Sequence, residues 1–518
     1  MGSSETMYGE SEFVKEMGLF REAAQRFGRA EITRKEYKGI SGRYGSYAQK
    51  GDCCMLRLRI PGGALSKENL EFIAGCVEEH HIDMVHLTTC QSVQLHNLEL
   101  QTACDIAESA FARGIHTLGG GGDYPRNITA SPLTGVEPGV HGDVLPYAKA
   151  AESYLMGIFG RTSLPRKMKI GFSDSNRNAA HATFRDLGFV CDSGGTFDVY
   201  IAGGLGKDPR MGLKAAQGID PGDALYHIRA MTGVFETHGD RSDRSRARTR
   251  YMQDSLGKER LLRAYREHLE EAKAAGGLGI STEASSECKA GEGRAPSHPR
   301  VHAQRQPGLY YVSYHPIGGD PPPSKLGEIY DTIADMDGAE VRIAPYGTVY
   351  VINCTSGEAL RVADSTEGGA ETVFQSSVSC VGSSICQIGQ GDSRSLLDEL
   401  VDMERRRGFC DGVLPRVRIS GCTSSCGAHQ VGSLGFRGAT KRIGGRPFPG
   451  FEVFVNGSHV RGEERFGISL GVMLDFDVPL FLGDLGDVVS AAGTTYDLWN
   501  PSHGPDLEAI ARVYTEKT

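Results

Sequence analysis

Residues 55–63 read MLRLRIPGG, and residues 311–319 read YVSYHPIGG. Each stretch resembles a strand that ends in a pair of glycines. An amphipathic stretch and a further strand-like run follow in both places; these are residues 64–81 and 84–96 in the first copy, and 325–337 and 340–353 in the second. From Gly62 to Val85 and from Gly318 to Val341 the separation is the same, 23 residues. The chain therefore contains a repeated strand, helix, strand unit.

A second repeat follows the first. Residues 164–189 begin LPRKMKIGFS, residues 414–436 begin LPRVRIS, and both segments end in a histidine followed by LGF. Helical and strand patterns alternate along the rest of the chain, which predicts an α/β (α+β) class. We predict a pseudo-two-fold duplicated fold, in which a small αβ unit and a larger domain each occur twice.

Composition limits the function classes. The 518 residues include 39% apolar and 23% charged side chains, ordinary values for a globular protein. The formal charge of −9 favours neither nucleic acid nor an anionic membrane surface as a partner. Residues 1–20 lack the apolar core of a signal peptide, and no apolar run approaches bilayer length, so we expect a cytoplasmic protein.

Closely spaced cysteines occur only in the second copy of the larger domain. Cys380 and Cys386 have five residues between them, and Cys422 and Cys426 have three. Aligning His181 with His429 sets Asp174 and Asn178 of the first copy opposite Cys422 and Cys426. Four cysteines in two pairs can hold zinc or an iron–sulfur cluster, or can be buried free thiols. The wide first pair favours a cluster over a zinc knuckle.

The cysteine pattern, C-x5-C followed by G-C-x3-C-G, resembles the ligand set of the sirohaem-dependent nitrite and sulfite reductase family. Further segments resemble that family in the same order, and the resemblance extends from about residue 45 to about residue 480; these segments are MLRLRIPGG (55–63), TTCQSVQLHNL (88–98), PRNITASPLTG (125–135), PRKMKIGFS (165–173) and FDVYIAGGLG (197–206). The resemblance implies a 4Fe-4S cluster on Cys380, Cys386, Cys422 and Cys426, with Cys426 also the axial ligand of sirohaem. It implies ferredoxin-like half-domains and two sirohaem/cluster-binding domains.

The resemblance also implies where domains begin and end. We expect a first ferredoxin-like half-domain (45–115), a first sirohaem-binding domain without a cluster (116–275), a linker or insertion (276–304), a second ferredoxin-like half-domain (305–370) and a 4Fe-4S and sirohaem-binding domain (371–518). The stretch 276–300 supports the linker, because it is rich in Gly, Ser, Glu and Ala without periodicity.

An anion pocket is expected over the open face of the haem. Similarity to the family places Arg57, Arg126, Lys167 and Lys169 there. Arginine suits fixed hydrogen bonds to oxyanion oxygens, and lysine can also supply protons. Taken singly, each of these residues would be an ordinary solvent-facing cation. Because Lys167 and Lys169 are two residues apart, their side chains share a face if the segment is extended.

One segment departs from the family pattern. Gln94 and His96 are retained as cofactor-binding residues, but Cys90 stands where the family commonly has an arginine, and His86 stands where another basic residue is frequent. Another cation is then needed near the cofactor carboxylates. The candidates lie in residues 241–250 (RSDRSRARTR), which could instead be a solvated basic segment or dock an acidic ferredoxin. Cys90 could be a redox-active thiol or simply a small residue against the macrocycle.

We therefore predict an oxidoreductase that reduces sulfite to sulfide with six electrons. The alternatives are reduction of nitrite to ammonia and a non-catalytic, cofactor-bearing subunit of a reductase complex. The presence of two lysines in this segment, Lys167 and Lys169, resembles the sulfite-reducing members of the family. The glycine runs match no dinucleotide or Walker motif, so electrons are expected from a ferredoxin or a flavoprotein.

Overall fold

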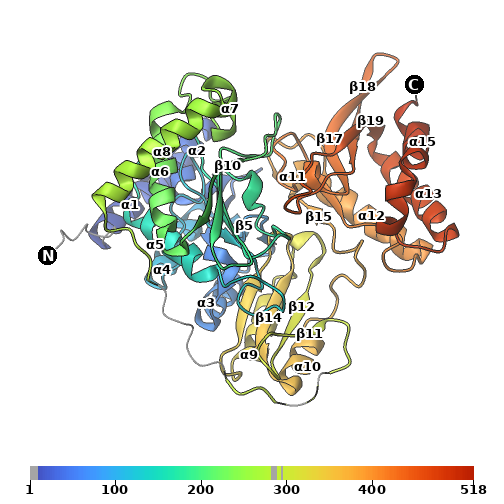
Figure 1. Ribbon diagram of the computed structural model, residues 1–518, viewed down its shortest axis with the longest axis horizontal. Coiled ribbons are helices and arrows are strands. Elements are labelled where there is room, and N and C mark those ends of the chain that lie inside the picture. The colour runs from blue at the N-terminus through green and yellow to red at the C-terminus, as the bar shows by residue number, and fades with distance from the viewer. Residues whose placement is uncertain (1–9, 282–288, 293, 295, 518) are drawn as a thin grey trace.

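The computed structural model describes residues 10–281, 289–292, 294 and 296–517. Within these residues the chain forms four sheets that come in two similar pairs. The lobe at the right of Figure 1 contains β15–β19 and the C-terminal helices, and the first copy of the larger domain lies at the left. The predicted linker, 276–304, lies partly outside the described residues.

The two small sheets repeat one arrangement. In the first, residue Arg57 pairs with Gln94, and in the second, Ser313 pairs with Tyr350, so the two ladders have equivalent registers. The first unit is built from β1 (Ser46–Ala48), β2 (Cys54–Arg59), α3 (Lys67–Glu79), β4 (Val85–Leu87), β5 (Ser92–Leu98) and α4 (Leu100–Ala112). The second is built from β11 (Val301–Ala303), β12 (Tyr310–Tyr314), α9 (Lys325–Ile333), β13 (Glu340–Ile343), β14 (Val349–Cys354) and α10 (Ser356–Ser365).

The strand-like run over residues 84–96 is two antiparallel strands rather than one. The chain reverses between β4 and β5, where Gln91 has a positive φ of 55° and its amide donates to the Thr88 carbonyl at 2.8 Å. Residues 340–353 reverse in the same way between β13 and β14. The first turn, residues 88–91, contains no Gly or Pro, whereas Pro345 and Gly347 lie in the second.

The two larger sheets share one topology. Their strand orders are β10-β9-β8-β7-β6 and β15-β16-β17-β18-β19. In each sheet the first three strands in chain order run parallel to one another. The fourth strand is antiparallel to the third, and the fifth is antiparallel to the fourth. Their bounds are β6 (Thr129–Ala130), β7 (Ile170–Ser173), β8 (Leu187–Cys191), β9 (Phe197–Ile201), β10 (Leu213–Ile219), β15 (Val378–Ser379), β16 (Val417–Ser420), β17 (Leu434–Ile443), β18 (Arg446–Val455) and β19 (Ile468–Leu474).

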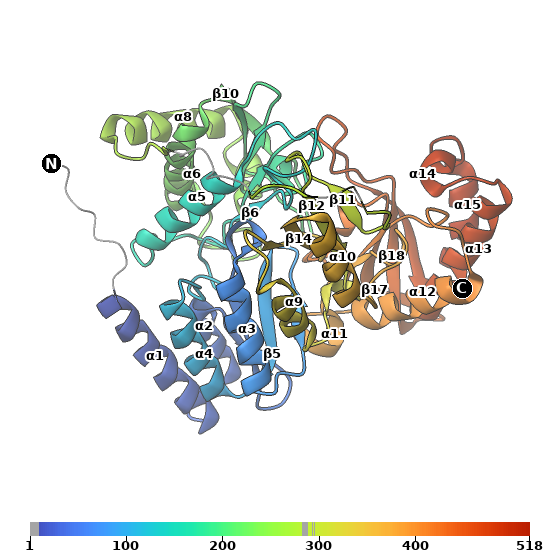
Figure 2. The ribbon, with the colours of Figure 1, turned by 90° about the horizontal axis from the view of Figure 1, so that it is seen from below.

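The remaining helices cover these sheets and the N-terminal side of the molecule (Figure 2). In the first half they are α1 (Glu10–Gly28), α2 (Arg34–Ser41), α5 (Leu145–Gly157), α6 (Ala224–His238), α7 (Met252–Ser255) and α8 (Lys258–Ala275). In the second half they are α11 (Gly382–Ile385), α12 (Ser393–Arg407), α13 (Val478–Ala491), α14 (Tyr496–Trp499) and α15 (Gly504–Thr515).

The two small sheets are joined into one body. Their buried residues form one continuous hydrophobic core, whereas each larger sheet has its own. The short strand β3 (Ala64–Leu65), from the first unit, extends the second small sheet by pairing with β13. Gly63 makes this crossing possible, because its φ is 71° and a Cβ there would lie 2.1 Å from the Ile343 carbonyl oxygen. The repeated glycine pair therefore serves close backbone approach.

A buried ion pair ties β2 to the first larger domain. The Arg59 side chain is fully buried and donates to both Glu152 carboxylate oxygens, at 2.5 and 2.7 Å. It also donates to the carbonyls of Pro125 and Arg126, at 2.8 and 3.1 Å. Arg59 thus holds the segment that carries Arg126 against the small sheet.

We expect Glu152→Ala to lower the free energy of unfolding by about 3–5 kcal/mol, because it leaves the Arg59 guanidinium buried without its counter-charge. Denaturant unfolding followed by fluorescence measures the change. Glu108→Ala is the matched control, since Glu108 forms an exposed ion pair with Arg21, and its loss should cost no more than about 1 kcal/mol. Equal effects of the two substitutions would contradict the anchoring role of Glu152.

Candidate functional site

The four paired cysteines lie at one edge of the second larger sheet. Cys380 directly follows β15 and Cys422 lies two residues after β16; these strands are adjacent and parallel, so both loops leave the same edge. Cys386 follows α11, and Cys426 ends the second loop. Close glycine contacts bring the loops together: the Gln390 and Gly391 amides both donate to the Gly421 carbonyl, at 2.8 and 2.9 Å.

Backbone amides point at the sulfurs. The Gly421 amide donates to Cys380 Sγ at 3.1 Å, and Ser393 Oγ lies 3.1 Å from the same sulfur. Burial raises the pKa of Cys386, as do Cys426 and Cys422, while amide hydrogen bonds from Ile388 and Gly389 act in the opposite direction. Amide hydrogen bonds to sulfur stabilise thiolates and are one of the features that set the potential of iron–sulfur centres.

The four thiols also influence one another. Burial raises the pKa of Cys426, and the nearby Cys380 and Cys422 add to that rise, while Lys167 and Lys169 oppose it. Among the described residues, no three His, Cys, Asp or Glu side chains are arranged to hold a metal ion. Cys380, Cys386 and Cys422 thus lie close enough to Cys426 to interact with it electrostatically, as do Lys167 and Lys169.

The first small sheet presents a row of polar side chains. Arg57, Gln94 and His86 are direct cross-strand neighbours on β2, β5 and β4. His86 Nδ1 lies 2.7 Å from the Asp320 carboxylate. His96 lies two residues beyond Gln94 on the same face, and burial and His86 lower its pKa to about 3. Neither ring nitrogen of His96 has a partner among the described residues, so a buried neutral imidazole is left to be satisfied.

The glycine run 119–122 receives the two predicted arginines. Arg57 donates to the Gly120 carbonyl. Arg126 donates to three carbonyls of the run, those of Gly119 and Gly122 at 2.9 Å each and that of Gly121. Burial lowers the pKa of Arg126 to about 9, and Arg57 and Arg59 add to that effect. Both guanidinium groups are thus positioned by backbone oxygens.

Lys167 and Lys169 lie on either side of Met168, which is fully buried. Met168 forms a bridge with Pro125, so this segment is extended just before β7, and the two half-buried lysines share the opposite face, as predicted. Burial lowers the pKa of Lys167 well below its ordinary value, as do Lys169, Arg126 and Arg248. Lysines with lowered pKa values can release protons near neutral pH.

The basic segment 241–250 contributes one arginine to this cluster. Arg248 donates to the Asp186 carboxylate at 2.7 Å, and the same carboxylate accepts the Lys169 backbone amide at 2.7 Å. The other arginines of the segment are engaged elsewhere; Arg244, for example, pairs with Asp123. Arg248 is therefore the member of the segment that lies beside the predicted lysines.

Cys90 lies near several of these cations. Its loop is held by Asn127 Nδ2, which donates to the Cys90 carbonyl at 2.8 Å, and by Thr89 Oγ1, which donates to the Cys426 carbonyl at 2.9 Å. Burial by itself raises the pKa of Cys90, but the charges of Lys169, Arg185 and Arg57 outweigh burial and lower the pKa to about 6. The Cys90 thiol is therefore largely anionic at neutral pH.

We expect Cys90 in the cofactor-free protein to react with iodoacetamide with a midpoint near pH 6. Lys169→Met should move this midpoint upward, because removing the positive charge disfavours the thiolate. Mass spectrometry of the alkylated peptides gives the profile, and the exposed Cys410 in the same samples reports the reagent's own behaviour. An identical Cys90 midpoint in both proteins would contradict the role of Lys169.

Arg185 was missed by sequence reasoning. It is buried, donates through Nε to the Ala180 carbonyl at 3.0 Å, and acts on the pKa of Cys90. It lies between two short elements of the first larger domain, and no motif distinguishes it. Arg185 lies two residues before β8, and β8 pairs with β7, the strand that follows Lys169. This pairing places Arg185 near the predicted lysines, and it is known only from the sheet topology.

The structure corrects the alignment of the two larger domains at the cysteines. Ile170 pairs with Leu187 and Val417 pairs with Leu434, and positive φ values at Asn178 and His181 recur at Ser425 and Ala428. These matches share one constant offset, which sets Ser175 opposite Cys422 and Ala179 opposite Cys426. Pairing the identical histidines, and hence Asp174 and Asn178 with the cysteines, is wrong by one residue.

The donor set fits a polyanionic cofactor next to a cluster. Backbone amides donate to Cys380 and Cys386, and Lys167 and Lys169 act on Cys426. The buried Asp186 carboxylate beside these lysines is already engaged by Arg248 and by the Lys169 amide. Excess buried positive charge requires anions, and the unpartnered His96 lies on the same sheet face. Sirohaem carboxylates, a 4Fe-4S cluster and an oxyanion substrate would satisfy these groups.

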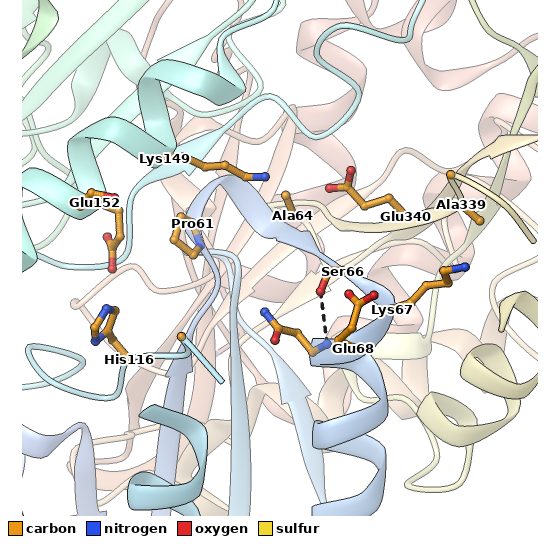
Figure 3. A pocket seen from close by; sticks show the side chains of 14 residues that line it. Pro61, Ala64, Ser66, Lys67, Glu68, His116, Lys149, Glu152, Ala339 and Glu340 are labelled. Atoms are coloured by element: carbon orange, nitrogen blue, oxygen red, sulfur yellow. Dashed lines mark hydrogen bonds between the residues drawn. The ribbon is translucent and has the colours of Figure 1, made fainter. Parts of the chain in front are cut away.

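A different pocket, of about 490 Å³, opens at the start of α3 (Figure 3). Ser66 caps this helix by accepting the Asn69 amide at 3.3 Å, and Lys67, Lys149 and Glu340 also line the pocket. None of the residues predicted from sequence to bind a cofactor or substrate lines it. Across the described part of the chain, no helix has both the length and the apolarity to cross a membrane.

Two protein-family models match this chain. The nitrite/sulfite reductase ferredoxin-like half domain matches residues 47–110, and the nitrite and sulphite reductase 4Fe-4S domain matches residues 121–273. The second match falls on the copy of the larger domain that lacks the paired cysteines.

Curated proteins and a solved structure extend the similarity over most of the chain. The ferredoxin–nitrite reductase of Synechococcus elongatus is 28% identical over 430 residues, 78% of this chain and 80% of that protein. The ferredoxin-type sulfite reductase of Mycobacterium tuberculosis is 26% identical over 440 residues, 80% and 75% of the two chains. The NirA protein of M. tuberculosis has the same fold, with a TM-score of 0.76 and 22% identity over 92% of this chain and 93% of that one. The chain thus resembles the sirohaem-dependent nitrite and sulfite reductases over most of its length, and it has the fold of the NirA protein.

Proposed function

We propose that this protein is an oxidoreductase that reduces sulfite to sulfide on a sirohaem coupled to a 4Fe-4S cluster. Cys380, Cys386, Cys422 and Cys426 would hold the cluster, and Cys426 would also be a ligand of the sirohaem. The observation that carries the proposal is the group of cations that acts on Cys90 and Cys426, the thiol proposed to bridge the two centres.

The cofactors, when bound, supply electrons one at a time and an iron atom that binds the lone pair of the substrate. The chain supplies charge and protons. Arg57 and Arg126 provide fixed positive charge for the substrate oxygens. Lys167 and Lys169 donate hydrogen bonds to those oxygens and supply protons as each oxygen leaves as water. The lowered pKa of Lys167 makes proton release from its ammonium group easier. Sulfite takes up six electrons and seven protons to give hydrosulfide and three water molecules.

The number of cations favours sulfite over nitrite. Sulfite is a dianion with three oxygens, whereas nitrite is a monoanion with two. A pocket with two lysines next to two arginines therefore gains more electrostatic stabilisation with sulfite. The alternative, reduction of nitrite to ammonia, is favoured by the similarity to the S. elongatus nitrite reductase.

Steady-state assays with reduced methyl viologen decide between the two anions. The purified protein should show a sirohaem absorption spectrum and a higher kcat/KM with sulfite than with nitrite. A higher value with nitrite would reverse the order, and a fully loaded protein without activity on either anion would support a non-catalytic role.

We further propose that a ferredoxin supplies the electrons and that the protein works in the cytoplasm. The first proposal rests on the ferredoxin-dependent relatives. The second rests on the twelve described cysteines, all free thiols, as expected in a reducing compartment. Reduced ferredoxin should support turnover, whereas NADPH with a flavoprotein reductase should not.

A further inference from the structure

The repeat creates a second cavity at the position equivalent to the proposed active site. The equivalent registers of the small sheets set Ser313 at the place of Arg57, Tyr346 at that of Cys90 and Tyr350 at that of Gln94. The larger sheets set Arg416 at the place of Lys169. All of these second-copy residues line a pocket of about 300 Å³ that lies between the two halves of the chain. Ser175 and Ala179 replace two of the cluster cysteines, so this cavity has lost that ligand set.

Arg418 is the unusual feature of this cavity. Its side chain is 5% exposed and lines the pocket. Among the described residues, its guanidinium group forms no hydrogen bond or ion pair, and no acid acts on its pKa. Burial lowers its pKa to about 10, and Arg416 adds to that effect. A buried cation without a counter-charge is costly, so such groups are normally paired or bind an anion.

The other charged groups around Arg418 do not neutralise its positive charge. Arg416 donates to Ser376 Oγ at 2.9 Å and lies over the Tyr346 ring, 5.3 Å from its centroid. Of the two acids that line the cavity, Glu137 is engaged by both terminal nitrogens of Arg177, at 2.6 Å each. Asp174 accepts from Ser175 at 3.0 Å, and burial raises its pKa. Neither acid pairs with Arg416 or Arg418.

Histidines and tyrosine rings also line the cavity. The His181 and His459 rings lie 5.2 Å apart, and burial together with Arg418 lowers the pKa of both, that of His459 to about 3. A neutral imidazole keeps one N–H and can donate it to an anion. Tyr346 and Tyr350 share a hydrogen bond of 3.1 Å.

We infer that this cavity is a second anion site, separate from the proposed active site, which binds a sulfate or phosphoryl oxyanion through Arg418 and Arg416. The ligand chemistry is that of a compact oxyanion, because guanidinium groups match such oxygens in pairs. The volume also leaves room for a small group beyond the anion, against the tyrosine rings.

Thermal unfolding of the cofactor-loaded protein at constant ionic strength tests the site. Sodium sulfate, sodium phosphate and phenyl phosphate are the probes. A larger rise in Tm with phenyl phosphate would identify a phosphate ester as the better ligand. A larger rise with the inorganic ions would identify a free oxyanion. Wild-type protein should show a saturable rise in Tm of about 2 °C or more. Arg418→Met should lose the saturable rise and melt higher than wild type without anion, because it removes an unpaired buried charge.

The controls separate this site from the active site and from general salt effects. Arg512→Met removes an exposed arginine and should behave as wild type. Anion binding at the proposed active site changes the sirohaem absorption spectrum, and this change should have a different anion dependence from the rise in Tm that requires Arg418. The two sites can therefore be tested independently, and failure of the proposed function leaves this test intact. Arg418→Lys should retain a weakened rise. A rise shared in full by Arg418→Met, or no saturable rise in wild type, would overturn the inference, as would crystals soaked in selenate without an anomalous peak at Arg418.

Discussion

Cys426→Ser should lose both visible chromophores and lower sulfite and nitrite turnover by more than about 100-fold. Cys426 is proposed to bind a cluster iron and the sirohaem iron, so its loss removes two metal–sulfur bonds at once. Substitution of outer groups around a metal site already costs about 10- to 100-fold, and a serine hydroxyl is a poor substitute for a thiolate at iron. Iron and acid-labile sulfide analysis, absorption spectra and methyl viologen assays measure the effect.

Cys410→Ser is the matched control for that substitution. Cys410 is an exposed free thiol of the same domain, outside the two cysteine pairs, and its replacement should leave cofactor content and turnover as in wild type. Full iron content in Cys426→Ser would contradict the ligand assignment. Loss of the cofactors in both variants would indicate general damage to the domain instead.

Lys169→Met should lower kcat by about 10²- to 10³-fold while the sirohaem spectrum is retained. The estimate follows from the cost of removing one preorganised donor to developing negative charge. Lys169 is held in place by its backbone amide bond to Asp186, so the substitution should not move the segment. Because Lys169 also stabilises the Cys90 thiolate, the pH profile of the remaining activity should shift as well.

Arg166→Met provides the comparison for Lys169→Met. Arg166 lies in the same segment, but its guanidinium pairs with Asp123 at 2.7 Å and takes no part in the proposed cation group. Its loss should change kcat by less than about twofold, since partly exposed ion pairs contribute little. Equal losses in the two variants would assign the effect to the fold of the segment rather than to the charge of Lys169.

Local sequence pattern predicted most of the architecture. The repeated PGG and LPR segments indicated the duplication, and the two pairs of sheets have the topology that a duplication requires. The amphipathic stretches 64–81 and 325–337 contain α3 and α9. These features depend on neighbours in the chain, where periodicity carries the information. The turn between β4 and β5 was missed because no Gly or Pro marks it.

Prediction of the site was less even. The two cysteine pairs could be recognised because spacing within a loop limits which ligands can meet. Arg185, Arg248 and Asp186 could not be ranked, because they meet Lys169 only after β7 and β8 pair and residues 241–250 fold back. The correct partners of Cys422 and Cys426 in the first copy also required the strand register, since the identical histidines are displaced by one residue.

The sequence alone thus determined the duplication, the class of fold and the four thiols, because each is written in short-range spacing and in the similarity of one half to the other. Tertiary structure decided which charges surround Cys90, how the glycine run holds Arg57 and Arg126, and that a second cavity contains an unpaired Arg418. Those properties depend on desolvation and on contacts between residues far apart in the chain, and burial is what converts an ordinary arginine or cysteine into one that needs a partner.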